Sequence, residues 1–113
     1  MDENCIFCKI IQGEIPSKKV YEDEEFLAFH DINPAATIHI LVIPKVHIPN
    51  LQEVTDETLI SKAYSVIRKI AIQENFAEQG YRVIVNCGKD AGQEVMHLHF
   101  HILAGEELGP KIR

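Results

Sequence analysis

From His97 to Leu103 a histidine occupies every second position of the chain. Side chains alternate between the two faces of a strand, so this run predicts a strand over residues 97–103. One face carries the three imidazoles of His97, His99 and His101, and the other carries Leu98, Phe100 and Ile102. The apolar face predicts contact with a core, which an exposed edge strand would not require. Because the ordinary pKa of histidine lies nearest neutrality, we expect the imidazole face to carry the chemistry.

The spacing of the three histidines limits how they can bind a metal ion. Positions i and i+2 of a strand lie roughly 6.5 Å apart at Cα and can share one ion, whereas the outer pair lies at about 13 Å. A metal therefore takes at most two of the three, which leaves an imidazole for another task. A neutral imidazole is a nucleophile, so phosphoryl or nucleotidyl transfer is favoured. A zinc hydrolase with the row as its metal ligands is the less favoured alternative.

Composition narrows the class of protein. The chain has 113 residues, of which 46% are hydrophobic and 25% charged, as expected of one globular domain. A net charge of -6 argues against nucleic acid as a partner, because no basic field is present to displace its counterions. No apolar run approaches the roughly 20 residues of a membrane span. The acidic start, Met1 to Asn4, does not resemble a signal peptide, so we expect a cytosolic protein.

Three cysteines are present, and two of them form the CxxC pair Cys5 and Cys8. In a reducing compartment such a pair indicates a metal or redox site before it indicates a disulfide. The third cysteine, Cys87, lies far along the chain. A thioredoxin-like site would place its CxxC after a strand within a βαβ unit, and this one lies at the extreme N-terminus. A metal site is therefore the favoured interpretation.

The first half of the chain predicts a short helix and three strands. Residues 5–12 favour a helix that Gly13 ends, with Ile6, Ile10 and Phe7 turned to one side. Strands are expected over 19–22, 26–30 and 37–43, in the order of a meander. The last of these is apolar almost throughout, as in a strand buried on both faces. His39 interrupts it and is either a site residue or a hydrogen-bonded core histidine.

The second half predicts one long helix and two strands. Thr55 is a plausible N-cap, and apolar residues recur at helical spacing until about Glu78, where Gly80 ends the helix. A strand over 81–87 and a glycine-bearing loop over 88–93 precede the histidine row. The glycine-bearing stretch from Asp90 to Glu94 favours contact between backbone amides and a phosphate group. Together these elements indicate an α+β fold with a mainly antiparallel, five-stranded sheet and one long and one short helix.

The histidine row and several other stretches of the sequence resemble those of a known family. The run from His97 to Leu103 is similar to the histidine triad motif, in which histidine and apolar residues alternate and two apolar residues follow. The rest of the chain resembles the Hint-like branch of that family almost from end to end, as a single domain over residues 1–113. The supporting stretches are 5–11, 13–16, 28–34, 39–45, 47–48, 86–88 and 92–95.

The resemblance implies an assembly and an activity. The expected assembly is a homodimer in which two five-stranded sheets join into one sheet of ten strands. The expected activity is hydrolysis of nucleoside 5′-monophosphate derivatives, namely purine nucleoside phosphoramidates and also aminoacyl adenylates, without nucleic acid or membrane as a partner. Two alternatives stay open: a dinucleoside polyphosphate hydrolase, and a nucleotide-binding regulatory protein with residual catalysis.

The resemblance also implies a role for individual residues. His99 matches the nucleophile that forms a nucleotidyl-histidine, His101 matches a contact to the phosphate, and His39 matches a histidine beside the nucleophile. Asn86 matches a residue near phosphate and ribose, and Asp31 matches the carboxylate that binds both ribose hydroxyls. The purine pocket would be apolar and the phosphate loop would follow Ala91. These remaining nucleotide-binding candidates are Ile6, Phe7, Ile10, Phe29, Ile32, Gly92, Gln93, Glu94 and Val95.

Glu94 and the CxxC pair add two further expectations to the resemblance. Glu94 stands where many Hint-like members have a serine or threonine that reaches the leaving group, and an ionised carboxylate there would alter proton delivery and repel phosphate. The CxxC pair matches a zinc site that some members of the superfamily carry. Its ligands here would be Cys5, Cys8, His47 and the first triad histidine, His97. Four protein ligands leave no open position, so the expected zinc is structural.

Overall fold

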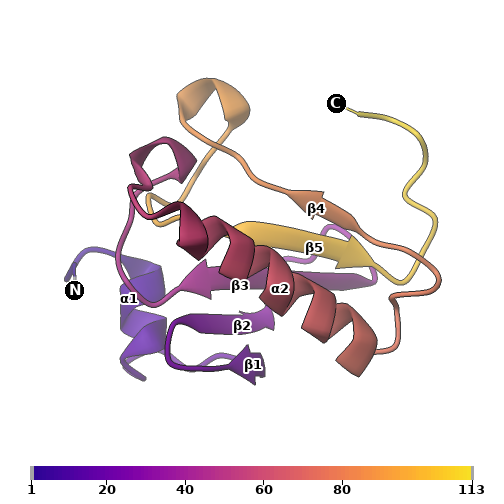
Figure 1. The fold of residues 1–113 in the computed structure, drawn as a ribbon, viewed down its shortest axis with the longest axis horizontal. Helices are drawn as coiled ribbons and strands as arrows, with labels where there is room; N and C mark the ends of the chain where they lie inside the picture. Colours follow the sequence, from indigo (N-terminus) through magenta and orange to yellow (C-terminus); the bar gives the residue numbers. More distant parts are fainter. Residues whose placement is uncertain (1, 113) are drawn as a thin grey trace.

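The computed structural model describes residues 2–112, and it contains a single antiparallel sheet with a helix on each face (Figure 1). The strand order is β1-β2-β3-β5-β4, and every neighbouring pair is antiparallel. This confirms the α+β fold, the meander of the first three strands and the pairing of the last two. The elements are α1 (Ile6–Ile11), β1 (Lys19–Glu22), β2 (Phe26–His30), β3 (Ile38–Pro44), η1 (Leu51–Glu53), α2 (Glu57–Gln73), β4 (Arg82–Ile84), η2 (Lys89–Ala91) and β5 (Phe100–Ala104).

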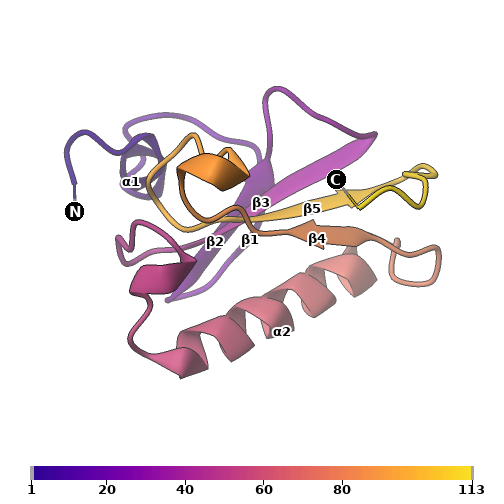
Figure 2. The same ribbon diagram turned by 90° about the horizontal axis from the view of Figure 1, so that it is seen from above.

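The two faces of the sheet belong to two separate apolar cores. The long helix α2 covers one face, and α1 lies on the other side (Figure 2). On β3 the alternate residues Ile40 and Val42 pack toward α2, while Leu41 and Ile43 pack toward α1. This confirms that β3 is buried on both faces. The chemistry-bearing residues described below lie on the side of α1, so the larger core under α2 supports them from behind.

The apolar stripe of α2 faces the sheet, as its periodicity predicts. Leu59, Ala63, Val66, Ile67 and Ile70 are all buried in the larger core. The intervening residues are mostly exposed and polar or charged. Within residues 2–112, no helix combines the length and the apolarity that crossing a membrane requires.

The ends of α2 differ from the sequence-based expectation. Asp56, not Thr55, is the N-cap, and its carboxylate accepts hydrogen bonds from both the amide and the hydroxyl of Thr58. The helix ends at Gln73 instead of Glu78, because Asn75 adopts a positive φ of 63°. The amides of Asn75 and Phe76 donate to Ile72 and Ala71, which forms a Schellman motif five residues before Gly80.

The two C-terminal strands are also shorter than predicted. Strand β4 covers Arg82–Ile84 instead of 81–87, and β5 begins at Phe100 instead of 97. Before β5, the amide of Leu98 donates to the carbonyl of Ile48, 2.7 Å away, so this segment is held by a loop and not by the sheet. The alternation nevertheless persists, because Leu98 packs with Phe100 and Ile102 in the core under α2. His97 and His99 therefore keep their predicted face while lying just outside the strand.

Candidate active site and metal-ligand cluster

A cavity of about 220 Å³ lies between β3, β5 and the loop before β5. Its lining brings together residues from six separate stretches of the chain. These residues are Phe7, Asp31, Leu41, Asn86, Gly92, Gln93, Glu94, Val95, His99 and His101. All of them except Leu41 are nucleotide-binding candidates from the sequence. A sequence signal for Leu41 exists, because it lies two residues after His39 and therefore shares the face of β3 that carries His39.

His99 lines the cavity with a defined arrangement of its ring nitrogens. Its Nδ1 lies 2.7 Å from the carbonyl oxygen of His97. A carbonyl only accepts, so Nδ1 carries the proton and donates it, and the neutral ring keeps its lone pair on Nε2. The ring also packs edge-on against Phe7, with centroids 5.2 Å apart, and only 8% of the residue is exposed. A buried imidazole held in this way presents one nucleophilic nitrogen in a fixed direction.

A chain of hydrogen bonds fixes the tautomer of His101. The amide of Ala35 donates to Nδ1 of His39 at 2.9 Å, so His39 carries its own proton on Nε2. That nitrogen lies 2.9 Å from Nδ1 of His101, to which it donates. His101 is consequently protonated on Nε2. An N–H donor thus stands beside the nucleophile, because the rings of His99 and His101 have centroids 5.0 Å apart.

Burial keeps these two supporting histidines neutral. Burial, together with the positive charges that His99 and His39 would carry, lowers the pKa of His101 from 6.5 to about 4. Burial also lowers the pKa of His39, and the carboxylate of Asp31 opposes that effect. At neutral pH the hydrogen-bond directions derived above therefore apply without competition from the imidazolium form.

Asp31 is held at the edge of the same cavity. Its Oδ1 accepts from the amide of Asn33 at 2.8 Å, and its Oδ2 lies 3.5 Å from Nε2 of His39. Asp31 follows the last residue of β2, and its amide donates to the carbonyl of His39 at 2.9 Å. The side chain is 20% exposed, so one carboxylate edge is available to a ligand.

The loop before β5 is shaped by glycine and clamped by Gln93. Gly88 has φ 84° and ψ -179°, a conformation that is essentially restricted to glycine. The buried side chain of Gln93 accepts from the amide of Gly88 and donates to the carbonyls of Pro49 and Val95. The amides of Gly92 and Gln93 donate within the loop, so amide contacts to a phosphate would come from the residues that follow.

The predicted purine pocket is only partly assembled around this cavity. Phe7 lines it and packs edge-on against Phe29, with ring centroids 5.7 Å apart, and Ile10 is buried in the same small core. Ile6 is 47% exposed and Ile32 is 90% exposed, and neither lines the cavity. The prediction that Ile6 lies on the apolar side of α1 is therefore wrong.

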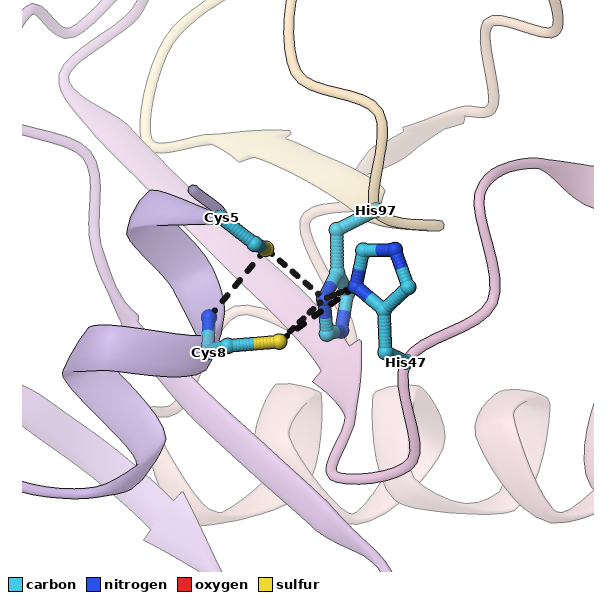
Figure 3. A group of neighbouring side chains, drawn as sticks. All are labelled: Cys5, Cys8, His47 and His97. Carbon is cyan, nitrogen blue, oxygen red and sulfur yellow. Dashed lines mark hydrogen bonds between the residues drawn. The ribbon is translucent and has the colours of Figure 1, made fainter. Parts of the chain in front are cut away.

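A second cluster lies beside the cavity and contains all four predicted zinc ligands. Cys5 and Cys8 come from the start of α1, while His47 and His97 come from two loops (Figure 3). Their ligand atoms all lie within 4.8 Å of one another. Nδ1 of His97 lies 3.2 Å from Sγ of Cys5, 3.6 Å from Sγ of Cys8 and 3.2 Å from Nδ1 of His47. The edges of a tetrahedral zinc site with these ligands are roughly 3.3–3.8 Å, and all three distances lie within about 0.1 Å of that range.

The histidine tautomers of this cluster also suit a metal. Nε2 of His97 donates to the carbonyl of Pro44 at 2.8 Å, which leaves the lone pair on Nδ1 and directs it at the cysteines. His47 turns its Nε2 toward the carboxylate of Asp2, 3.7 Å away, and its Nδ1 toward Sγ of Cys8. Partners of this kind on the outer nitrogen are typical of metal-bound histidines.

Two residues join the cluster to the cavity. His97 contributes its side chain to the cluster and its carbonyl to the hydrogen bond that orients His99. Phe7 lies between the two cysteines in sequence, and its ring packs edge-on against both His97 and His99. The position of the nucleophilic nitrogen therefore depends on the same segment that the cluster holds in place.

The chain is similar to known proteins along nearly its whole length. The family model described as the HIT domain matches residues 12–108. A purine nucleoside phosphoramidase of Escherichia coli strain K12 is 47% identical over 99% of this chain and 96% of that protein. A histidine triad protein from Clostridium difficile superimposes with a TM-score of 0.95 at 53% identity, covering 98% of both chains. A HIT family hydrolase from Clostridium thermocellum gives 0.96 at 49% identity, covering 100% of both.

Proposed function

This chain belongs to the HIT domain family, and we propose that it hydrolyses purine nucleoside 5′-phosphoramidates through a nucleotidyl intermediate on His99. The observation that carries the proposal is the hydrogen bond from Nδ1 of His99 to the carbonyl of His97, which leaves Nε2 as the free nucleophile in the cavity. The name of the Escherichia coli relative, 47% identical, supports this substrate class.

The proposed reaction has two displacements at phosphorus. In the first, the lone pair on Nε2 of His99 forms a bond to phosphorus, and the bond from phosphorus to the leaving amine breaks. The electron pair of that bond stays on the amine nitrogen, which takes up a proton from solvent. In the second, a water oxygen bonds to phosphorus and releases a proton to solvent, while the electron pair of the P–N bond returns to His99. Covalent catalysis of this type divides one difficult step into two easier ones.

His101 acts in this scheme as a hydrogen-bond donor to a phosphoryl oxygen. Its Nε2–H follows from the hydrogen bonds of Ala35 to His39 and of His39 to His101. A fixed donor is worth most where negative charge develops in a site that excludes water. His39 is a positioning residue, because it acts through His101, and Asn86 supplies a second polar group on the cavity wall.

The nucleoside would be held by Asp31 and by apolar side chains. Asp31 has a partly exposed carboxylate at the edge of the cavity, which suits a pair of ribose hydroxyls. Phe7, Leu41 and Val95 provide apolar wall, and Phe29 and Ile10 support Phe7 from behind. In the proposed complex the exposed side chains of Ile6 and Ile32 pack against the outer edge of the purine.

We also propose that the cysteine and histidine cluster binds a structural zinc ion. Cys5, Cys8, His47 and His97 would supply the four ligands, and distances and tautomers both fit a tetrahedral site. Zinc with four protein ligands has no open position, so it would contribute cross-linking of α1 to two loops and no Lewis-acid chemistry.

The assembly that we propose is a homodimer joined at β4. This strand is at the edge of the sheet and its three residues are only half-buried. An edge strand presents unpaired backbone groups, and pairing with the same strand of a second copy would give one ten-stranded sheet. A single-chain mass in light scattering would contradict this assembly.

The central test replaces the nucleophile. His99→Ala and His99→Asn should lower kcat for an adenosine 5′-phosphoramidate by at least ~10³-fold, because the covalent step is lost, while AMP still binds. Rapid quenching of the wild-type reaction followed by mass spectrometry should detect an adenylyl group on His99. His30→Ala, which removes an exposed histidine of β2, is the matched control and should retain full activity. Turnover near the wild-type level in both His99 variants would exclude the mechanism.

A further inference from the structure

The cavity that contains the nucleophile has an unusual balance of charge for a phosphate site. Its lining includes two carboxylates, Asp31 and Glu94. No lysine or arginine of the described residues 2–112 belongs to the lining. Proteins commonly bind phosphate groups with Arg or Lys, which provide charge-assisted hydrogen bonds. The cavity histidine His101 stays neutral at pH 7, since its pKa is about 4. A substrate with several negative charges therefore meets repulsion and no cationic lining residue.

Glu94 is the more exposed of the two carboxylates that line this cavity. The side chain of its neighbour Gln93 is buried and makes hydrogen bonds to Gly88, Pro49 and Val95, so the backbone that carries Glu94 is fixed. Glu94 itself is exposed while lining the same cavity as His99. Lys89 and Asp90 lie on η2 nearby, outside the lining, and their opposite charges offset each other.

Asp31 and Glu94 have different surroundings. Asp31 is 20% exposed, contacts His39 and the amide of Asn33, and is assigned to the ribose hydroxyls in the proposed function. Glu94 is exposed to solvent while lining the cavity, and it makes none of the contacts that hold Asp31. A leaving group on phosphorus points away from the attacking nitrogen of His99, so it leaves by an open side.

We propose that Glu94 selects the charge of the leaving group, so that phosphoramidates of amines bearing an additional positive charge are preferred and anionic leaving groups are rejected. The inference rests on the proposed function and specifies its substrate class. When the P–N bond breaks, its electron pair stays on nitrogen. One solvent proton completes the neutral amine, and a second converts it to an ammonium. The carboxylate of Glu94 attracts this charge and any further cationic group on the amine. It repels a carboxylate-bearing amine or a polyphosphate.

The test compares three adenosine 5′-phosphoramidates of matched length whose amines are N-(2-aminoethyl), N-propyl and N-(carboxymethyl). Diadenosine tetraphosphate serves as a strongly anionic fourth substrate. Each is assayed with the wild-type protein, with Glu94→Gln, and with Glu78→Gln, which removes an exposed carboxylate that does not line the cavity. The intrinsic reactivity of each substrate cancels when its kcat/KM is expressed as a ratio between variants.

We expect Glu94→Gln to lower the preference for the cationic over the anionic phosphoramidate by about tenfold, equivalent to about 1.4 kcal/mol. The variant should also raise kcat/KM for diadenosine tetraphosphate, and Glu94→Lys should reverse the preference. Added salt should weaken the wild-type preference, because the carboxylate is exposed. Glu78→Gln should leave every ratio unchanged.

An unchanged ratio in Glu94→Gln and Glu94→Lys, with His99-dependent turnover of phosphoramidates intact, would overturn the inference and leave the proposed function standing. Absence of His99-dependent turnover of any phosphoramidate by the wild-type protein would instead overturn the proposed function itself. Thermal unfolding of each variant shows whether a changed ratio comes from the charge or from a damaged fold.

Discussion

Two groups of potential metal-ligand side chains are present in this protein, and a backbone group sets the histidine tautomer differently in each. The cluster of Cys5, Cys8, His47 and His97 and the cluster of Asp31, His39 and His101 each bring their ligand atoms within 4.8 Å. In the first, a backbone carbonyl meets the outer nitrogen of His97, so the lone pair faces inward. In the second, a backbone amide meets the outer nitrogen of His39, so the proton faces inward.

The comparison teaches that residue type alone does not make a metal site. A metal ion needs a lone pair on each nitrogen that faces it, and the backbone group behind the ring decides where that lone pair is. The amide of Ala35 directs a proton of His39 at His101 and so favours a hydrogen-bonded relay over an ion. We therefore expect metal at the cysteine cluster alone, and catalysis to depend on the other cluster.

The largest expected effect tests the metal side of this comparison. His97→Ala removes one of four proposed zinc ligands and should abolish high-affinity metal binding, whereas the wild-type protein binds one Zn²⁺ or Co²⁺ per chain. Loss of a structural metal should lower the free energy of unfolding by ~3 kcal/mol or more, since metal binding is coupled to folding. Metal analysis and thermal unfolding are the measurements.

His30→Ala serves as the control here as well, because it removes a histidine that belongs to neither cluster. It should bind one metal ion and unfold at the wild-type temperature. Two findings would contradict the comparison: a His97→Ala protein that keeps its metal, or a wild-type protein that binds a second ion at Asp31, His39 and His101.

A smaller effect is expected in the cluster of Asp31, His39 and His101. His101→Asn removes the N–H donor beside the nucleophile and should lower kcat/KM about 100-fold, the low end of the range for losing one fixed donor near developing charge. Its metal content should stay at the wild-type value, since no ligand of the cysteine cluster is touched. Steady-state kinetics and metal analysis on the same preparation test both halves. Loss of metal with activity preserved would reverse the roles assigned to the two clusters.

The sequence predicts which side chains form the two clusters, but it does not predict the backbone groups that give the clusters different properties. The alternation of histidines, the CxxC pair and the resemblance to the histidine triad family predict the fold and the residues of both clusters. The difference between the two clusters depends on the carbonyl of Pro44 and the amide of Ala35. Such backbone groups are present whatever the side chain is, apart from the missing amide of proline. No residue pattern marks them, so only the folded structure identifies them.

The errors in element boundaries have a similar origin. Asn75 ends α2 early because it adopts a left-handed conformation in a Schellman motif, while Gly80 gave the stronger sequence signal. His97 and His99 lie before β5 because the carbonyl of Ile48 takes the amide of Leu98. In both places a contact with a distant or unmarked backbone group outweighed local preference.

The smallest expected effect is a pH dependence of the free energy of unfolding that arises from His101 and His39. The pKa of His101 is about 4 in the folded protein and 6.5 when unperturbed, and burial also lowers the pKa of His39. Between these values the unfolded chain binds more protons than the folded one, so the free energy of unfolding is highest above pH 6.5 and falls as the pH approaches 4. Allowing for its partial exposure to solvent, His101 should contribute about 1–2 kcal/mol to that loss.

Urea titrations at neutral pH and near pH 4.5 measure this effect when the wild-type protein is compared with His101→Asn. Acid also protonates the cysteine cluster, but both proteins share that cluster, so its contribution cancels in the difference. The variant should lose less stability on acidification than the wild type, because the unfolded chain no longer gains the proton of His101. An equal loss in both proteins would mean that His101 is protonated at no cost. The proposed difference between the two clusters would then be wrong, because it requires a neutral His101 that donates a hydrogen bond.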